Sequence, residues 1–279
     1  MMRFEGKVAL VTGAAGDIGQ ATAVQLASQG ARVAVFDRRE DLLAETVELC
    51  AKATGDAAAV LALGVDQTNA DAVENGIARV ADELGSIGVL FANAGYGRFA
   101  RFLDQPAAEW DRHVAVNLTG TFRICQSVAR RMVEQAQGGS IVVNASSGAE
   151  QHTDLLTAYC STKAAIRMLA IGMASELGSH RIRVNCVMPG VVETGMTAPM
   201  LQSPDGAAQA ELLLANTPVG RLGVPQDVAN LVTFLLSDDA GFITGEAVMI
   251  DGGQRIHGHP QWYATDYRNE HEDIWSVGL

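Results

Sequence analysis

Short apolar runs rich in β-branched residues alternate with longer Ala-, Leu- and Glu-rich segments, and this alternation constrains the fold of the chain most. Seven runs have the length of strands: Val8–Val11, Arg32–Phe36, Ala58–Leu63, Ile87–Phe91, Ser140–Val143, Arg183–Met188 and Ala247–Ile250. Segments between them are long enough for helices, as in Ile18–Gln29, Asp41–Ala53 and Ala70–Leu84. Strands joined by crossover helices form a parallel sheet buried on both faces, so each strand is apolar almost throughout. We therefore predict an α/β fold with a single doubly wound, parallel, seven-stranded sheet and helices on both faces.

A chain of 279 residues is long enough for one large α/β domain, and no internal repeat or low-complexity linker divides it. We predict one domain over residues 1–253 and a C-terminal extension over residues 254–279. The extension is rich in tryptophan and tyrosine, whereas disordered tails are usually poor in aromatic residues. We expect it to pack on its own subunit or on a neighbouring one, and the sequence does not separate these possibilities.

The charge and the cysteines exclude several classes of function. A formal net charge of −12 disfavours nucleic acid, whose phosphates need a basic surface. No apolar run reaches the roughly 18–20 residues that span a bilayer, and the N-terminus lacks the apolar region of a secretory signal. We therefore expect a cytoplasmic protein that does not bind membranes. The four cysteines are scattered and His257-Gly258-His259 lacks a third ligand, so neither disulfides nor a metal site is predicted.

A glycine-rich turn from Thr12 to Gly19 follows the first predicted strand and opens a helical pattern. In such a turn, backbone N–H groups can approach a diphosphate closely, and the helix N-terminus favours its negative charge. By itself the turn is equally typical of a strand-to-helix connection that binds nothing. Asp37 changes this balance, because it ends the second strand 18 residues after Gly19, where a carboxylate can accept from both hydroxyls of an adenosine ribose.

Asp37 also indicates which dinucleotide binds. Its carboxylate would repel the additional phosphate of NADP, so we expect NAD as the cofactor ahead of NADP. Arg38 and Arg39 follow immediately and are able to hold such a phosphate, although arginines there are equally typical of a solvated helix start.

Further motifs resemble those of the classical short-chain dehydrogenases/reductases over the range Lys7 to Gly253. They are the glycine turn, Asp66, Asn93-Ala94-Gly95, Asn117, Ser146, Tyr159-x-x-x-Lys163, Pro189-Gly190 with Thr194, and Ile243-Thr244-Gly245 followed by Asp251-Gly252-Gly253. Each motif is weak alone, whereas the ordered set at the family's spacings is very specific. The resemblance implies a Rossmann-type fold and an NAD(P)-dependent oxidoreductase that interconverts a secondary alcohol and its ketone.

The resemblance makes Tyr159 the general acid/base. Removing hydride from an alcohol carbon requires the hydroxyl proton to leave at about the same time. The pKa of free tyrosine is near 10, so it must fall by roughly 2–3 for a phenolate to form at neutral pH. Lys163, four residues later on the same helix face, is expected to stabilise the phenolate, assisted by the positive nicotinamide. In the family this lysine also bonds the nicotinamide ribose, and Asn117 resembles the asparagine that holds a water behind it; by itself, Asn117 could instead interrupt a helix.

A serine is expected to hold the substrate oxygen beside the tyrosine. Two serines compete for this role. Ser146 lies 13 residues before Tyr159 and at the usual distance after Gly138-Gly139, whereas counting from Asn144 selects Ser147. We favour Ser146, because two measures agree, and expect the other serine to cap or brace the loop.

The other roles carried over from the family concern the dinucleotide. Asp66 should accept from the adenine amino group, Asn93 should support the turn near the ribose, Ile18 should pack near the nicotinamide, and Val192 and Thr194 should contact its carboxamide. The remaining cofactor-binding residues that we predict are Gly13, Gly16, Asp17, Gly19, Gln67, Ala94, Gly95, Pro189 and Gly190, with Tyr159 and Lys163. Two of these depart from the family: Asp17 replaces the middle glycine of the turn, and Gln67 replaces a frequent valine. The charge of Asp17 would weaken diphosphate binding unless it points to solvent.

The predicted substrate walls are Tyr96, the loop Gly148–Leu156 and the flexible stretch Gly195–Asn216, which is punctuated like a lid. Methionine and leucine dominate the last stretch, so we expect a hydrophobic alcohol or ketone, with cyclic and aromatic compounds included. The helix Ala164–Leu177 is apolar nearly all round, which predicts burial on two sides and a subunit interface. The usual dimer or tetramer of the family uses this helix, so the resemblance implies a homotetramer.

Two other functions remain open. A dinucleotide-binding regulator would keep the fold without turnover, although such relatives typically lose the tyrosine or the lysine. A 3-oxoacyl-type ketoreductase would prefer NADP and a basic docking surface, which Asp37 and the acidic composition disfavour.

Overall fold

The computed structural model describes residues 2–201 and 206–256. Seven parallel strands form one sheet in the order β3-β2-β1-β4-β5-β6-β7. The strands are β1 (Val8–Thr12), β2 (Arg32–Asp37), β3 (Val60–Gly64), β4 (Ile87–Ala92), β5 (Gly139–Asn144), β6 (Ile182–Pro189) and β7 (Ala247–Ile250). The predicted fold class is confirmed. The largest shift is at β3, which starts two residues later than predicted because Asp56 caps a 3₁₀ turn over Ala57–Ala59.

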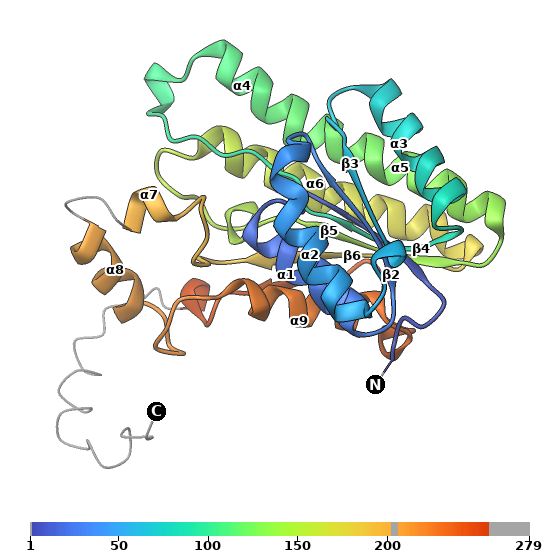
Figure 1. The fold of residues 1–279 in the computed structure, drawn as a ribbon. Coiled ribbons are helices and arrows are strands. Elements are labelled where there is room, and N and C mark those ends of the chain that lie inside the picture. The colour runs from blue at the N-terminus through green and yellow to red at the C-terminus, as the bar shows by residue number, and fades with distance from the viewer. Residues whose placement is uncertain (1, 202–205, 257–279) are drawn as a thin grey trace.

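Helices cover both faces of the sheet (Figure 1). On one face lie α1 (Asp17–Ser28), α2 (Ala44–Thr54) and α9 (Pro225–Leu236); on the other lie α3 (Ala70–Glu83), α5 (Thr121–Gln135) and α6 (Thr157–Leu177). Each face has its own apolar core, and successive strand residues point into opposite cores: Leu10 belongs to one and Val11 to the other. This double burial explains why the strands read as continuous apolar runs.

The strand order reverses beside β1. β2 lies on one side of β1 and β4 on the other, because the chain crosses over after β3. In open α/β sheets this reversal leaves a crevice beyond the carboxyl ends of the strands, where ligands bind. The fold therefore places Thr12, Asp37 and Asn93 at a common edge.

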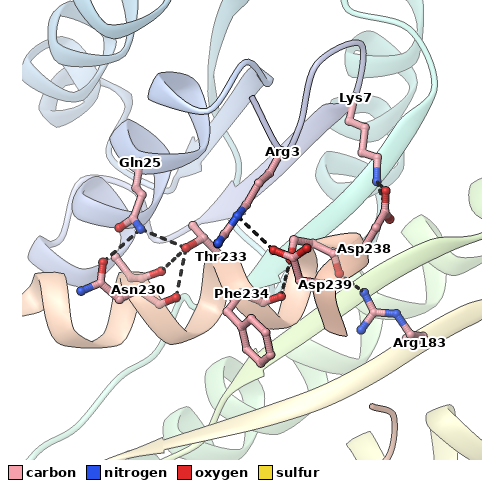
Figure 2. A network of polar contacts seen from close by, with 11 residues as sticks. Arg3, Lys7, Gln25, Arg183, Asn230, Thr233, Phe234, Asp238 and Asp239 are labelled. Atoms are coloured by element: carbon pink, nitrogen blue, oxygen red, sulfur yellow. Dashed lines mark hydrogen bonds and ion pairs between the residues drawn. The ribbon is translucent and has the colours of Figure 1, made fainter. Parts of the chain in front are cut away.

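Polar contacts fasten the N-terminal segment and α1 to α9 and the turn that follows it (Figure 2). Lys7 and Arg3 pair with Asp238 and Asp239 at 2.8 and 3.1 Å, and Gln25 Nε2 donates to Thr233 Oγ1 at 3.0 Å. Ion pairs this exposed contribute about 1 kcal/mol or less each. Beside them, Arg183 donates to the carbonyl groups of Leu235 and Ser237, which satisfies the C-terminal end of α9, and to that of Ile243.

Three segments near the sheet edge differ from regular secondary structure or from expectation. α4 (Ala107–His113) continues through a π-helical turn, η4 (Val114–Gly120), into α5. The stretch predicted to be a flexible wall contains two helices, α7 (Ala198–Leu201) and α8 (Gly206–Ala215).

The predicted C-terminal extension is described only to Ile256, in a short 3₁₀ turn. Within it, Gln254 accepts from the Val191 N–H and Arg255 pairs with Glu150. The packing of the rest, including the pair His257 and His259, lies outside the described residues. Among the helices of residues 2–201 and 206–256, none is both long and apolar enough to cross a membrane.

Candidate active site

A cleft of about 880 Å³ opens over the carboxyl ends of the strands. Nearly all of the predicted site residues line it: Gly13, Gly16, Asp17, Ile18, Asp37, Asp66, Gln67, Asn93, Ala94, Gly95, Ser146, Tyr159, Lys163, Pro189, Gly190, Val192 and Thr194. Ser147, the competing serine, lines it as well. Gly19 and Asn117 do not line it themselves. Gly19 packs against Gly13 and Asn117 bonds Tyr96, and both of these neighbours line the cleft.

The glycine turn between β1 and α1 is closely packed. A Cβ on Gly19 would lie 2.2 Å from the carbonyl oxygen of Gly13, so only glycine fits without a backbone shift. Gly13 itself has a φ of 64°, in the left-handed region. No side chain caps the N-terminus of α1 at Gly16. Free N–H groups at a helix start that borders the cleft fit the diphosphate of a dinucleotide.

The Asp17 carboxylate, which was expected to repel a diphosphate unless it points to solvent, has a hydrogen-bond partner in the chain. Its Oδ2 accepts a hydrogen bond from the backbone N–H of Gly195 at 2.9 Å. The residue therefore ties the glycine turn to the loop after β6, which the sequence does not indicate.

The residues predicted for the adenosine end are held by local hydrogen bonds. Asp37 accepts from the backbone of Arg39 at 3.1 Å, and one oxygen of Asp66 accepts from both the N–H and the hydroxyl of Thr68. Gln67 is buried and donates to the carbonyl of Val116 at 2.8 Å. The bonds to Asp37 and Asp66 fix the orientation of these two carboxylates, both of which line the cleft.

Polar side chains also join the ends of β1, β4 and β5. Thr12 Oγ1 accepts from the backbone N–H groups of Asn93 and Ala94, both at 3.0 Å. Asn93 Nδ2 donates to Gly13 O, and Asn144 Nδ2 donates to Asn93 Oδ1 at 2.8 Å. The support of the turn by Asn93 was predicted, whereas these roles of Thr12 and Asn144 were missed. Their available signal was position, since each is the last residue of its strand.

Three residues meet at the reacting end of the cleft. Ser146 is a hydrogen-bonding neighbour of the Tyr159 phenol, and its oxygen also accepts from the Gly148 N–H at 3.1 Å. The bracing bond expected of the second serine thus belongs to Ser146. Lys163 is buried, with its Nζ 5.4 Å from the centre of the Tyr159 ring, and it donates to the Asn144 carbonyl at 2.7 Å.

The electrostatics of this trio differ from the sequence-based expectation. Burial raises the pKa of Tyr159 to about 12, and the hydrogen bond with Ser146 offsets only part of this rise. Burial lowers the pKa of Lys163 to about 8. The lysine bonds a carbonyl rather than the phenol, so the chain's own residues keep Tyr159 neutral.

Asn117 lies in the π-helical turn and holds a neighbouring segment. Its Oδ1 accepts from the Tyr96 N–H at 2.7 Å, and its Nδ2 donates to the Tyr96 carbonyl and to Thr162 Oγ1. The side chain therefore bonds other segments rather than its own helix. π-helical turns often occur at functional sites, and this one connects the substrate wall with α6.

The side of the cleft that was predicted to hold the substrate contains Tyr96, Gly97, Phe99, Leu156 and Met196. A Cβ on Gly97 would lie 3.4 Å from the Tyr159 ring and 3.6 Å from the Met196 sulfur. The segment after Asn93-Ala94-Gly95 therefore runs past the Tyr159 ring, and residues of the two loops that were predicted as substrate walls line the same cleft. Arg112, which the sequence did not single out, joins this wall.

A doubly wound sheet with a dinucleotide-sized cleft at its strand-order reversal, and a tyrosine, lysine and serine together in that cleft, defines a nicotinamide-dependent oxidoreductase. The family model described as enoyl-(acyl carrier protein) reductase matches residues 13–255. The chain belongs to the classical short-chain dehydrogenase/reductase family.

Relatives cover almost the whole chain. It is 40% identical to D-threitol dehydrogenase of Mycolicibacterium smegmatis, over 91% of this chain and 95% of that protein. It is 36% identical to L-rhamnose 1-dehydrogenase (NAD(P)(+)) of a Sphingomonas species, over 92% and 99%. The crystal structure of NAD⁺-bound xylitol dehydrogenase matches with a TM-score of 0.84 at 33% identity, covering 90% of this chain and 100% of that one. The protein is thus an NAD(P)-dependent oxidoreductase acting on CH–OH groups.

Proposed function

We propose that the protein interconverts a secondary alcohol and its ketone, with NAD as cofactor and Tyr159 as the general acid/base. The observation that carries this proposal is the Tyr159 phenol in the cleft, with Ser146 beside it and Lys163 behind its ring. When bound in the oxidised form, NAD⁺ would supply the hydride acceptor and a positive charge.

Each residue has a separate task in this proposal. Ser146 donates to the substrate oxygen and orients it toward Tyr159. In ketone reduction the neutral Tyr159 gives its proton to that oxygen, and in alcohol oxidation the phenolate takes the proton back. Lys163 provides positive charge behind the phenol, and Asn117 positions Tyr96 at the substrate wall.

Asp37 supports NAD ahead of NADP. Its carboxylate lines the cleft at the end of β2, where the additional phosphate of NADP would meet a negative charge. Arg38 and Arg39 also line the cleft, so the two cofactors must be compared directly.

The apolar wall of Phe99, Leu156 and Met196 supports a hydrophobic substrate, with cyclic and aromatic alcohols or ketones included. The names of the relatives favour a second class, the polyols and sugars. Ser147 and Thr153 in the same cleft offer hydroxyl groups to such a substrate.

We also propose a homotetramer. One side of α6 is buried in the core through Ile166, Ala170 and Ala174, while Met168 on another side is 63% exposed. An outward apolar side of a core helix is typical of a subunit interface. Sedimentation equilibrium at micromolar concentration tests this, and a monomer there would contradict it.

The test of function is turnover of NAD and NADP over a panel of hydrophobic alcohols, polyols and sugars, with wild type and Tyr159→Phe. We expect NAD-linked turnover that falls by about 10²–10⁴-fold in the variant. Dinucleotide binding should persist in Tyr159→Phe. Binding without turnover of any alcohol or ketone by the wild type would instead favour the regulator.

A further inference from the structure

Arg112 places a positive charge on the substrate side of the cleft. It lies in the last turn of α4, and its guanidinium carbon is 4.2 Å from the centre of the Tyr96 ring. The side chain lines the cleft and is exposed to it. Within residues 2–201 and 206–256, no carboxylate lies within 4.0 Å of this guanidinium to form an ion pair.

The nearest candidate partner is already engaged. Glu109 lies one turn earlier on α4, accepts from the Tyr96 hydroxyl at 2.6 Å, and pairs with Arg98 at 2.7 Å. The Tyr96 hydroxyl bond and the charges of Arg98 and Arg112 keep the pKa of Glu109 low, so Glu109 stays ionised, with its hydrogen bonds going to Tyr96 and Arg98. Two arginines therefore share one carboxylate, which leaves a net positive charge on this wall of the cleft.

The Tyr96 residue, whose ring lies beneath the Arg112 guanidinium, is held at several points. Asn117 holds the Tyr96 backbone at both its N–H and its carbonyl, and Glu109 holds the hydroxyl. The buried His113 packs against the Tyr96 ring at a centroid distance of 4.9 Å and bonds the Glu109 carbonyl at 2.7 Å. A guanidinium over such a ring keeps N–H donors free for another partner.

This cation stands near the reacting centre rather than at the ribose end. Tyr96 is followed by Gly97, where a Cβ would lie 3.4 Å from the Tyr159 ring and 3.6 Å from the Met196 sulfur. Arg38 and Arg39, the other arginines of the cleft, follow Asp37 at the end of β2.

We propose that Arg112 binds a carboxylate on the substrate, so that the enzyme acts on a hydroxy acid and the corresponding keto acid. The inference rests on the proposed alcohol–ketone reaction and specifies its substrate. A guanidinium is able to bond both oxygens of a carboxylate, which fixes the orientation of the substrate as well as its charge. The apolar wall then accommodates the carbon skeleton between the carboxylate and the reacting carbon.

The test compares hydroxy acids with their methyl esters, matched in skeleton, in wild type, Arg112→Gln and Arg101→Gln. Arg101 is a matched control because it is an exposed arginine outside the cleft. We expect wild type to prefer the acid by about tenfold or more in kcat/KM, which corresponds to about 1.4 kcal/mol. Arg112→Gln should raise KM for the acid by a similar factor, leaving kcat and the ester nearly unchanged, and Arg101→Gln should behave as wild type.

Three outcomes would overturn the proposal. Equal loss for acid and ester would mean that Arg112 only packs on Tyr96. Weaker NADH binding in Arg112→Gln, measured by fluorescence titration, with an unchanged acid-to-ester ratio would assign Arg112 to the dinucleotide. No preference for the acid in wild type would exclude the carboxylate. Tyr159→Phe distinguishes failure of this proposal from failure of the proposed reaction, because full turnover in that variant refutes the proposed reaction whatever Arg112 does.

Discussion

The dinucleotide side and the substrate side of one cleft are built in different ways. On the dinucleotide side, residues at strand ends bond to one another and to the backbone, as Thr12, Asn93 and Asn144 do. On the substrate side, Tyr96, Glu109 and Arg112 come from a loop and a short helix, and they depend on side-chain contacts. The first arrangement is dictated by the sheet and allows little variation. The second is free to change with the substrate, which is why functional differences within a fold concentrate in such segments.

The largest expected effect comes from a substitution in the glycine turn on the dinucleotide side. Gly19→Ala would place a Cβ 2.2 Å from Gly13 O, and the shift needed should cost about 1–3 kcal/mol and abolish NADH binding. The matched control is Gly16→Ala in the same turn, whose Cβ would meet Gly13 O at an ordinary 3.6 Å. Thermal melting without dinucleotide should separate the two variants, and equal melting temperatures would show that the turn adapts.

The next largest effect is expected where the two sides meet, at the serine beside Tyr159. Ser146→Ala should lower kcat by about 10²–10³-fold, because it removes the hydroxyl that neighbours the phenol. Ser147→Ala should change kcat by less than about threefold, since Ser147 has no such contact. The reverse ranking in steady-state kinetics would assign the substrate oxygen to Ser147.

A smaller effect tests the connection between the sides. Asp17→Gly removes both a charge near the diphosphate site and the bond to Gly195, whereas Asp17→Asn removes the charge and keeps an acceptor. We expect tighter NADH binding in both variants. A fall in kcat of about 2–10-fold, the value of one hydrogen bond, should occur only in Asp17→Gly. The same kcat in both variants would mean that the bond does not position the loop.

The same contrast explains what the sequence could predict. The strand positions were predictable because burial on both faces demands continuous apolar runs. The residues Asp66 and Asn93 after two strands, and Tyr159 and Lys163 on α6, were predictable because they belong to the family motifs. The 3₁₀ turn before β3 and the helices α7 and α8 were not, since local capping and propensity decide them. Nor was the Tyr96–Arg112 stack, whose members are 16 residues apart and share no motif. The partner of Asp17 is a backbone group of a distant loop, which no side-chain pattern indicates.

The smallest expected signal, one phenolate, sharpens the assignment of the catalytic tyrosine. Because burial raises the pKa of Tyr159 to about 12, it should remain protonated at pH near 10, where an exposed tyrosine is half ionised. Wild type and Tyr159→Phe should then show the same phenolate absorbance without dinucleotide. Adding NAD⁺ should create a difference of one phenolate, since the positive ring favours the charged form. A difference before NAD⁺ is added would mean that burial does not keep the phenol protonated. The chain's own residues would then be sufficient to form the phenolate, and the proton could leave Tyr159 before the cofactor binds.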